Sequence, residues 1–482
     1  MSETLDADPP IATTPAVAAP SRTDGRSGGW WWSGLRPLVL RLHFYVGIFV
    51  GPFLLVAAAT GLLYTITPQL EQIVHRGALT VASVGTDAVP LRAQVAAAVG
   101  AVPDARITEI RPPRTPDGTT RVSFAAPGVA DGDARTAFVD PYTGQVAAVL
   151  DTSGEWLPVR AWFDELHRNL LLGTVGEVYS EVAASWLWVL ALSGLALWIV
   201  QRRRRSRIKR TLLPEGSASG RVRLRSWHGS VGLWAAIGML FLSATGLTWS
   251  QFAGANVTAL RAALDWSTPA VSRTLPAAAM TAATEPADLG STADRVLAAA
   301  RASGLSDPVA ITPGAAGKAW VVKQVQRSWP EKQDAVAVDP TTATVTDALP
   351  FADWPIAAKL ARWGIDAHMG LLFGAANQAI LAVLALGIIC MVIWGYRMWW
   401  LRRPTRGGTA GPPGGNQRPG PGAVLLVGLV AVAAGMFLPV LGVTLLLFLL
   451  ADLGLQELRK RRSGPGFSSP SQPDAARLGG ER

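Results

Sequence analysis

The chain has 482 residues, of which 49% are hydrophobic and only 16% are charged. A soluble fold normally carries about 25% charged residues, so this composition, with a mean hydropathy of +0.27, favours a membrane protein with soluble inserts. The single cysteine, Cys390, excludes an intramolecular disulfide and any metal site built from several thiolates. The net charge is +10, but the basic residues are dispersed outside any nucleic-acid-binding motif, and we expect no nucleic-acid partner.

Six segments are apolar enough to be membrane spans, since a span needs about 20 mainly apolar residues. The last two form a hairpin that is split by Pro439. In chain order we place the spans at residues 36–66, 179–200, 227–250 and 376–400, with the final pair together in 422–453.

Lysine and arginine predict the orientation of these spans, because they concentrate on the cytoplasmic side of a membrane. The loop 201–226 is strongly basic, whereas the long loops 67–178 and 251–375 have 9 basic against 13 acidic and 10 basic against 11 acidic residues. We therefore expect the two long loops outside and both termini in the cytoplasm. The cytoplasmic segments are then a disordered tail at 1–35, the loop 201–226, a linker at 401–421 and a tail at 454–482.

The spans and their flanks repeat. The histidine, glycine and threonine positions of the first span recur in the third at the same spacing, and the start of the second span recurs at the fourth. The matching motifs are His43-x3-Gly47 with His228-x3-Gly232, Thr60-Gly61 with Thr245-Gly246, and His167-x2-Leu-Leu-x-Gly173 with His368-x2-Leu-Leu-x-Gly374. We predict that a unit of span, outer domain and span occurs twice, as in parallel repeats.

Each outer loop is predicted to be a small α+β domain. The first has a helical pattern at 89–99 and alternating runs at 105–111, 120–125, 135–140 and 145–150; the second has a helix at 292–303 and strands at 318–325 and 333–339. Asp140-Pro-Tyr-Thr-Gly144 predicts a hairpin turn, and Asp339-Pro-Thr-Thr-Ala343 is its counterpart. Because the second turn has no glycine, we expect a degenerate second domain.

Four of the five histidines fall at equivalent places in the two copies, and this distribution predicts two bis-histidine sites. His43 and His228 would form an inner site near the cytoplasmic face, and His167 and His368 an outer site. Gly61 lies 18 residues, or five helical turns, after His43 and so shares its face, which would leave room for a flat macrocycle. Imidazole is a common axial ligand of haem iron, and two such ligands favour electron transfer.

Other roles for these residues stay open. Histidines in spans also serve as polar packing contacts, and glycines often serve close helix packing. Metal transport is a less favoured hypothesis, because no carboxylate or thiol lies near His43 or His228 in the sequence. His75 has no counterpart in the second copy, and we expect it on the surface. With no dinucleotide-binding motif in the cytoplasmic segments, the electron donor would be a quinol or a separate cytoplasmic reductase.

With these motifs and the paired Val-Asp-Pro-x-Thr hairpins, the chain resembles, over residues 36–401, the PepSY-associated transmembrane proteins, a group that includes ferric-siderophore reductases. The resemblance implies an α-helical polytopic protein of the cytoplasmic membrane, with two extracytoplasmic PepSY-like domains and an additional C-terminal hairpin. It also implies two b-type haems on His43, His228, His167 and His368, and a haem-dependent reduction of a ferric siderophore or other ferric chelate in iron acquisition.

Two rival functions fit the same pattern. The chain would be either a non-enzymatic PepSY membrane protein that regulates a peptidase or another partner, or a component of a ferric-chelate permease. If it is a reductase, Trp162, Trp363 and Arg362 are candidates for the rim of the acceptor site, although their position also suits interfacial anchors. No residue is assigned a catalytic role.

Overall fold

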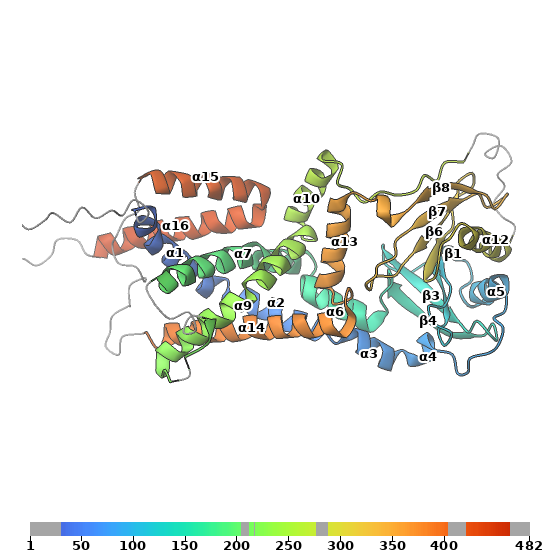
Figure 1. The fold of residues 1–482 in the computed structure, drawn as a ribbon, viewed down its shortest axis with the longest axis horizontal. Coiled ribbons are helices and arrows are strands. Elements are labelled where there is room, and N and C mark those ends of the chain that lie inside the picture. Colours follow the sequence, from blue (N-terminus) through green and yellow to red (C-terminus); the bar gives the residue numbers. More distant parts are fainter. Residues whose placement is uncertain (1–29, 204–211, 216, 276–287, 403–420, 463–482) are drawn as a thin grey trace, which may run out of the picture.

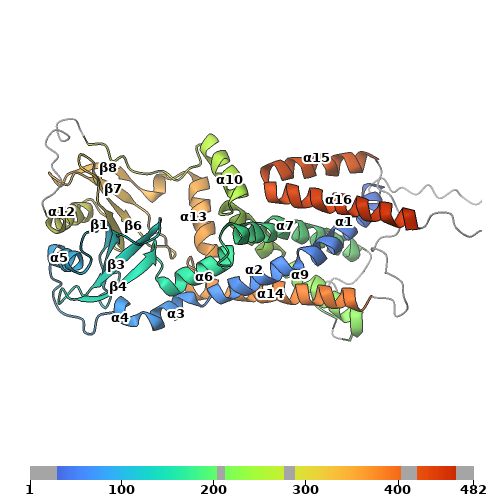
Figure 2. The same cartoon turned by 180° about the vertical axis from the view of Figure 1, so that it is seen from behind.

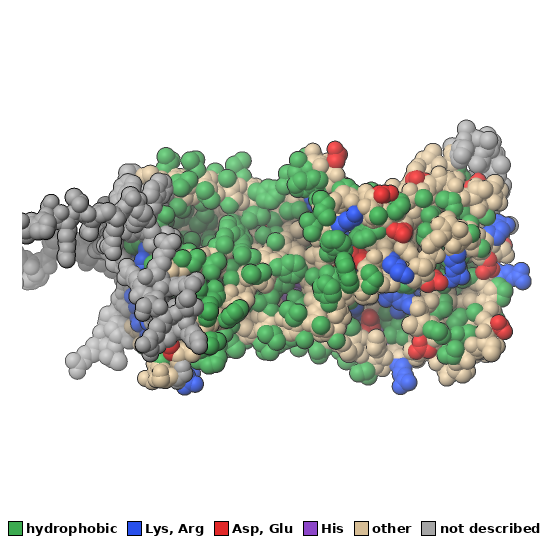
Figure 3. Space-filling view, in the orientation of Figure 1, with side chains coloured by type: hydrophobic (Ala, Val, Ile, Leu, Met, Phe, Trp, Pro, Cys, Tyr) green, Lys and Arg blue, Asp and Glu red, His purple; other side chains and the backbone are tan. Residues whose placement is uncertain are grey.

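The fold is that of a computed structural model, which describes residues 30–203, 212–215, 217–275, 288–402 and 421–462. The molecule is elongated, with a helical bundle at one end and a β-sheet at the other (Figures 1 and 2). The helices α6 (Pro158–Asn169) and α13 (Ile356–His368) lie between these two parts. Hydrophobic side chains cover the visible face of the bundle, whereas charged side chains gather over the sheet (Figure 3). The bundle therefore has the surface of a membrane-embedded part.

Three helices in the described part of the chain are long and apolar enough to cross a membrane: α7 (Thr174–Arg203), α9 (Gly220–Thr248) and α14 (Gly374–Trp400). The predicted first span consists of two helices that are bent by 59° and make a fourth crossing if they count as one. The C-terminal hairpin holds only shorter apolar helices. The prediction of six spans is thus supported in part. The remaining helices of the bundle are α1 (Trp30–Phe49), α2 (Gly51–Tyr64), α15 (Pro421–Phe437) and α16 (Pro439–Arg462).

The bend between α1 and α2 follows from the sequence Gly51-Pro52. Proline has no backbone N–H, so the carbonyl of Ile48, four residues earlier, loses its helical partner, and prolines commonly kink helices in this way. The hydroxyl of Tyr396 on α14 donates a hydrogen bond to this carbonyl instead. Gly51 lets the ring approach, since a Cβ atom here would lie 3.0 Å from Cε2 of Tyr396.

Both outer loops contain a helix followed by four strands. The predicted helices and hairpins are confirmed, but the predictions omitted β5, which has only four residues between Pro308 and Pro313, and β8. The first loop forms α3 (Thr67–Val74), α4 (Arg76–Leu79), α5 (Leu91–Ala101), β1 (Arg106–Arg111), β2 (Thr120–Ala125), β3 (Asp133–Val139) and β4 (Val146–Ser153). The second forms α10 (Phe252–Ala263), α12 (Leu289–Ala302), β5 (Val309–Thr312), β6 (Trp320–Gln324), β7 (Ala335–Val338), β8 (Val345–Leu349) and the short 3-10 helix Phe351–Asp353.

The two sets of strands form one eight-stranded antiparallel sheet in the order β4-β3-β2-β1-β5-β6-β7-β8. The two halves join where β1 pairs with β5, with Ile110 opposite Ile311, and both side chains are fully buried. A single hydrophobic core runs beneath both halves and includes residues of α5 and α12. The two outer domains predicted from the sequence therefore share one sheet and one core.

Contacts between α5 and α12 join the halves a second time. The carboxylate of Asp294 on α12 accepts hydrogen bonds from the backbone amides of Leu91 and Arg92, at 2.9 and 3.1 Å. It thus caps the N-terminus of α5, where the cap residue Pro90 provides no side-chain hydrogen bond. Gly290 makes this approach possible, because a Cβ atom there would lie 2.6 Å from the Cα of Arg92.

The two hairpin turns have the same hydrogen bonds. In the first turn the amide of Gly144 donates to the carbonyl of Asp140 at 2.9 Å, and in the second the amide of Ala343 donates to the carbonyl of Asp339 at 2.9 Å. Each aspartate side chain also accepts from the amide two residues on, at 2.8 Å. Ala343 takes the left-handed conformation (φ +55°) that Gly144 takes at φ +70°. The turn therefore forms without the glycine whose absence led us to expect a degenerate second domain.

Candidate functional site: two histidine pairs

The inner pair consists of His43 on α1 and His228 on α9, whose ring centres are 6.2 Å apart with the ring planes at 84°. Nδ1 of His43 lies 2.9 Å from Oγ of Ser193 on α7, and Nδ1 of His228 lies 3.0 Å from the carbonyl oxygen of Met391 on α14. Four helices of the bundle therefore meet at this pair.

The outer pair consists of His167 near the end of α6 and His368 at the end of α13, with ring centres 6.5 Å apart. Nδ1 of His167 lies 2.9 Å from Oγ1 of Thr60 on α2, and Nδ1 of His368 lies 2.6 Å from Oγ1 of Thr245 on α9. The structure thus brings together the same two pairs that the sequence repeat predicts. It also gives the repeated threonines a role that sequence reasoning missed, because each one orients a histidine of the outer pair.

The partners of the four Nδ1 atoms indicate which ring nitrogen carries the proton. The carbonyl of Met391 only accepts, so Nδ1 of His228 must donate to it. Ser193, Thr60 and Thr245 each donate their hydroxyl proton to a backbone carbonyl of their own helix, so each accepts from its histidine. We infer that all four rings are protonated at Nδ1 and have a free lone pair at Nε2. Within the described residues no hydrogen bond reaches these Nε2 atoms.

Glycines lie directly against two of the rings. A Cβ atom at Gly61 would lie 3.1 Å from Cε1 of His167, and one at Gly194 would lie 3.1 Å from Cε1 of His43. The sequence places Gly61 on the same helix face as His43 but five turns away, and in the structure this glycine lies against His167 of the outer pair. A spacing of 18 residues corresponds to about 27 Å along a helix, so this glycine belongs to the outer end of the bundle.

The two pairs fit haem iron better than a bare metal ion. If two imidazoles bind one metal, each coordinating nitrogen lies about 2 Å from it, and the ring centres are then about 6 Å apart. Both observed separations agree with this value. No group of three or more histidine, cysteine or carboxylate side chains suited to a metal occurs among the described residues. Zinc usually needs four protein ligands, or three and a water, whereas a haem brings its own four equatorial nitrogens and needs only two axial ligands.

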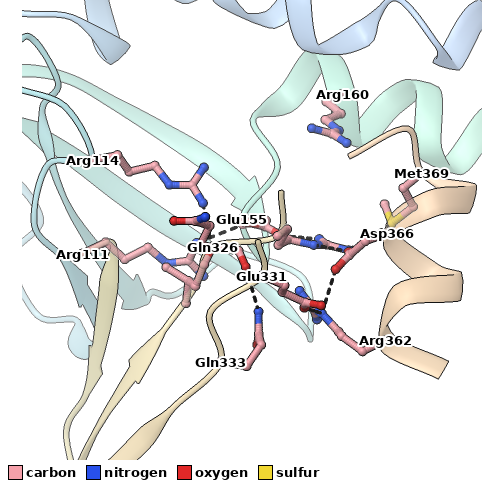
Figure 4. A network of polar contacts seen from close by, with 12 residues as sticks. Arg111, Arg114, Glu155, Arg160, Gln326, Glu331, Gln333, Arg362, Asp366 and Met369 are labelled. Carbon is pink, nitrogen blue, oxygen red and sulfur yellow. Dashed lines mark hydrogen bonds and ion pairs between the residues drawn. The ribbon is translucent and has the colours of Figure 1, made fainter. Parts of the chain in front are cut away.

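A network of charged side chains lies between the sheet and α13, the helix that ends at His368 (Figure 4). The Arg327 guanidinium, on the connection between β6 and β7, pairs with Glu155 after β4 and with Asp366 on α13, two residues before His368. It also donates to the sulfur of Met369, the residue after His368, at 3.3 Å. One side chain therefore links the first half of the sheet to the helix that positions an outer histidine.

Burial and opposite charge act differently on two carboxylates of this network. Burial opposes the ionisation of Glu155, but Arg327 and Arg111 outweigh it and lower the pKa of this carboxyl. For Glu331, burial is the largest effect and raises the pKa to about 7, with Asp366 adding to the rise and Arg362 opposing it. Arg362 contacts both carboxylates, Glu331 at 2.8 Å and Asp366 at 2.9 Å. Burial thus brings the pKa of Glu331 close to neutral pH.

The predicted rim residues have different surroundings. Trp162 is 49% exposed and packs on Phe163, and Trp363 packs against Trp329 with its indole nitrogen buried and without a hydrogen-bond partner in the described chain. Arg362 belongs to the charged network. Their role at an acceptor site stays a prediction.

His75 is partly exposed, in agreement with the surface position that the sequence predicts. It ends α3, it is partly buried, and burial lowers the pKa of its imidazole. Its Nε2 atom is buried and without a hydrogen-bond partner among the described residues. His75 belongs to neither histidine pair.

Comparison with known proteins identifies the family. Residues 40–402 match the family model of the PepSY-associated TM region. No curated protein matches the chain. The apolar helices and the family together make this a multi-pass membrane protein. Because the match covers more than half of its length, the chain belongs to the PepSY-associated transmembrane family.

Proposed function

We propose that this protein is a di-haem membrane reductase, which carries electrons across the bilayer to an extracytoplasmic acceptor, the ferric iron of a siderophore. His43 and His228 would hold the inner haem, and His167 and His368 the outer haem. One observation carries the proposal: both pairs have ring centres about 6 Å apart, with all Nδ1 atoms hydrogen-bonded and all Nε2 atoms free to bind a metal.

The chain's own residues would fix the ligands before a cofactor binds. Ser193, Thr60, Thr245 and the carbonyl of Met391 hold the four rings in one tautomer and orientation, as outer-shell partners of metal-binding histidines do. A haem with two histidine ligands supplies reversible one-electron transfer and has no open position for oxygen. This ligand set therefore favours electron transfer over oxygen activation.

The positions of the two histidine pairs along α7 support a path for electrons through the bundle. Ser180 of α7 donates to the backbone carbonyl of His167, and Ser193 contacts His43. These residues are 13 positions apart, which corresponds to about 20 Å along a helix. The two sites therefore lie at different depths, one towards the sheet and the other towards the opposite end.

We place the sheet outside the cytoplasmic membrane and the other end of the bundle in the cytoplasm, because basic residues flank the spans at that end. We also propose that the chain is a duplicated unit of span, PepSY domain and span, to which the hairpin α15–α16 is added. The equivalent histidines, the equivalent hairpin turns and the β1–β5 pairing support this duplication. An electron donor, either a quinol or a cytoplasmic reductase, would then act at the inner pair.

Absorption spectroscopy of the detergent-purified full chain tests the proposal. We expect a low-spin spectrum with two haems per chain. His43→Ala and His228→Ala should each remove the inner haem, and His167→Ala and His368→Ala the outer one, whereas His75→Ala should keep both. A colourless protein would rule out the reductase and favour a non-enzymatic PepSY protein or a permease component.

The acceptor is tested separately. The protein is reduced chemically and mixed with a ferric hydroxamate, and a chromogenic chelator detects the ferrous product. Each iron takes up one electron, so the absorption of the reduced protein should decrease in step with the ferrous iron formed. If the reduced spectrum persists while both haems are present, ferric hydroxamate is not the acceptor although the electron-transfer role stands.

A further inference from the structure

A groove of about 470 Å³ opens at the end of the bundle away from the sheet. It lies between the first turns of α9 and the last turns of α14, and its lining is mostly apolar. The walls are the side chains of Leu224, Trp227, Trp394 and Leu401, and the cations are Arg223 and Arg397. The two tryptophan rings are 5.9 Å apart and tilted by 59°.

Among the residues that the structure describes, the positive charge in this groove has no acidic partner. The lining contains no carboxylate, and neither Arg223 nor Arg397 makes an ion pair with any residue that the structure describes. Both arginines are exposed, so their charge is available to a ligand. A suitable ligand therefore has an anionic group next to a long apolar part.

We propose that this groove binds an anionic phospholipid, with its phosphate between the two arginines and an acyl chain along the tryptophan and leucine side chains. Basic pockets between membrane helices commonly bind anionic head groups, and tryptophans typically lie at the level of those head groups. A quinol fits less well, because its oxidation needs a group that accepts protons and the lining contains only arginine as an ionisable residue.

The groove is next to the inner histidine pair. Trp227 directly precedes His228, and the carbonyl that orients His228 belongs to Met391, one helical turn before Trp394. A bound lipid would hold the ends of α9 and α14 together beside this pair. The inference uses the membrane placement of the proposed function but not the haems, so its test does not depend on them.

Native mass spectrometry of the full chain in detergent tests this site, with phosphatidylglycerol and phosphatidylcholine of identical acyl chains as probes. We expect tighter binding of phosphatidylglycerol. Each arginine near an anionic lipid contributes about five-fold to binding, so the double variant Arg223→Gln/Arg397→Gln should weaken phosphatidylglycerol binding by about 25-fold. The matched control is Arg221→Gln/Arg225→Gln, two exposed arginines of the same helix outside the groove.

Two results would overturn the proposal. Equal loss of binding in the groove variant and the control variant would mean that any basic residue at this end attracts the lipid. Binding of glycerol phosphate that is as tight as that of phosphatidylglycerol would mean that the site recognises a free phosphate and that the apolar wall takes no part. Thermal unfolding of both variants is the control for misfolding. We expect both to unfold at the same temperature as the natural chain.

Discussion

Each of the four paired histidines donates its Nδ1 proton to an adjacent helix and keeps the lone pair of Nε2. The ring centres are similarly spaced in both pairs, but the ring planes are at 84° in the inner pair and 48° in the outer pair. The acceptors also differ: a serine hydroxyl and a backbone carbonyl at the inner pair, and a threonine hydroxyl twice at the outer pair. The inner pair has no repeated acceptor side chain, which is why the sequence repeat does not reveal its partners. The repeated Thr-Gly motif, in contrast, marks the outer pair.

At the residue scale, the glycines beside the imidazole rings lead to a prediction about haem affinity. An alanine at Gly61 would place its Cβ 3.1 Å from His167, and one at Gly194 would place it 3.1 Å from His43, so in each case the ring must shift by a few tenths of an ångström. Since the orientation of the coordinating imidazole controls metal affinity, we expect Gly61→Ala to weaken the outer haem and Gly194→Ala the inner one, each by about ten-fold or more. Haem titration followed by absorbance measures both affinities.

Gly47 provides the control, because a Cβ atom there would meet nothing within 4 Å. Gly47→Ala should bind both haems as the natural chain does. The interpretation fails if Gly61→Ala weakens the inner haem and leaves the outer one unchanged, because the ring that Gly61 faces is that of His167 in the outer pair. The sequence spacing does not show which ring Gly61 meets, because that depends on how α6 packs against α2.

At the element scale, most helices and strands follow from local pattern, and the exceptions have local causes. Alternating apolar residues predicted β1 to β4, β6 and β7. β5 has four residues, too few for alternation to stand out, and it is held by pairing with β1, a strand about 200 residues earlier. The C-terminal helices α15 and α16 were predicted as spans from their apolar residues, but the apolar parts of both are shorter than a usual span.

The second hairpin turn leads to a prediction about stability. Ala343 has a left-handed conformation at φ +55°, which costs a residue with a Cβ about 1–2 kcal/mol. Glycine would remove this cost but would lose more chain entropy on folding. We expect Ala343→Gly to raise the free energy of unfolding by about 0.5–1 kcal/mol, and Gly144→Ala in the equivalent turn to lower it by about 1 kcal/mol.

Denaturant unfolding in detergent, followed by tryptophan fluorescence, measures both changes. Trp320 of β6 is nearly fully buried in the shared core, and its emission is the part of the signal from the 19 tryptophans that comes from the sheet interior. The two variants should change the stability in opposite directions. If Ala343→Gly is destabilising, then contacts of the alanine side chain outweigh its backbone strain.

At the scale of the whole molecule, the two copies of the repeat are joined rather than merely placed side by side. The β1–β5 pairing, the cap that Asp294 provides for α5, and the bridge from Glu155 through Arg327 to Asp366 each link the first half to the second. Repeated motifs predict equivalent halves but not the surface along which they meet. That surface is formed by side chains far apart in sequence, such as Ile110 and Ile311. Both are apolar and could pack against many other apolar residues, so the sequence does not show that they pair.

The charged network at this junction predicts a pH dependence of stability. Burial raises the pKa of Glu331 from 4.5 to about 7, so between these values the folded chain keeps this proton while the unfolded chain has lost it. The contribution of Glu331 to the free energy of unfolding is therefore fully present below pH 4.5 and is lost as the pH rises through about 7. Between about pH 5 and pH 8 we expect a loss of about 1–3 kcal/mol from this group.

Glu331→Gln isolates this contribution, because glutamine occupies the same space without titrating. Arg362 keeps its contact with Asp366 at 2.9 Å in the variant, so the network retains an ion pair. Denaturant unfolding of the detergent-purified chain at both pH values should show a smaller decrease in stability for Glu331→Gln than for the natural chain, whereas Asp87→Asn, at an exposed aspartate, should behave as the natural chain does. Equal pH dependence of Glu331→Gln and the natural chain would mean that Glu331 is already ionised throughout this range. In that case Arg362 would outweigh burial, and the junction between the sheet and α13 would be held by charge pairs alone.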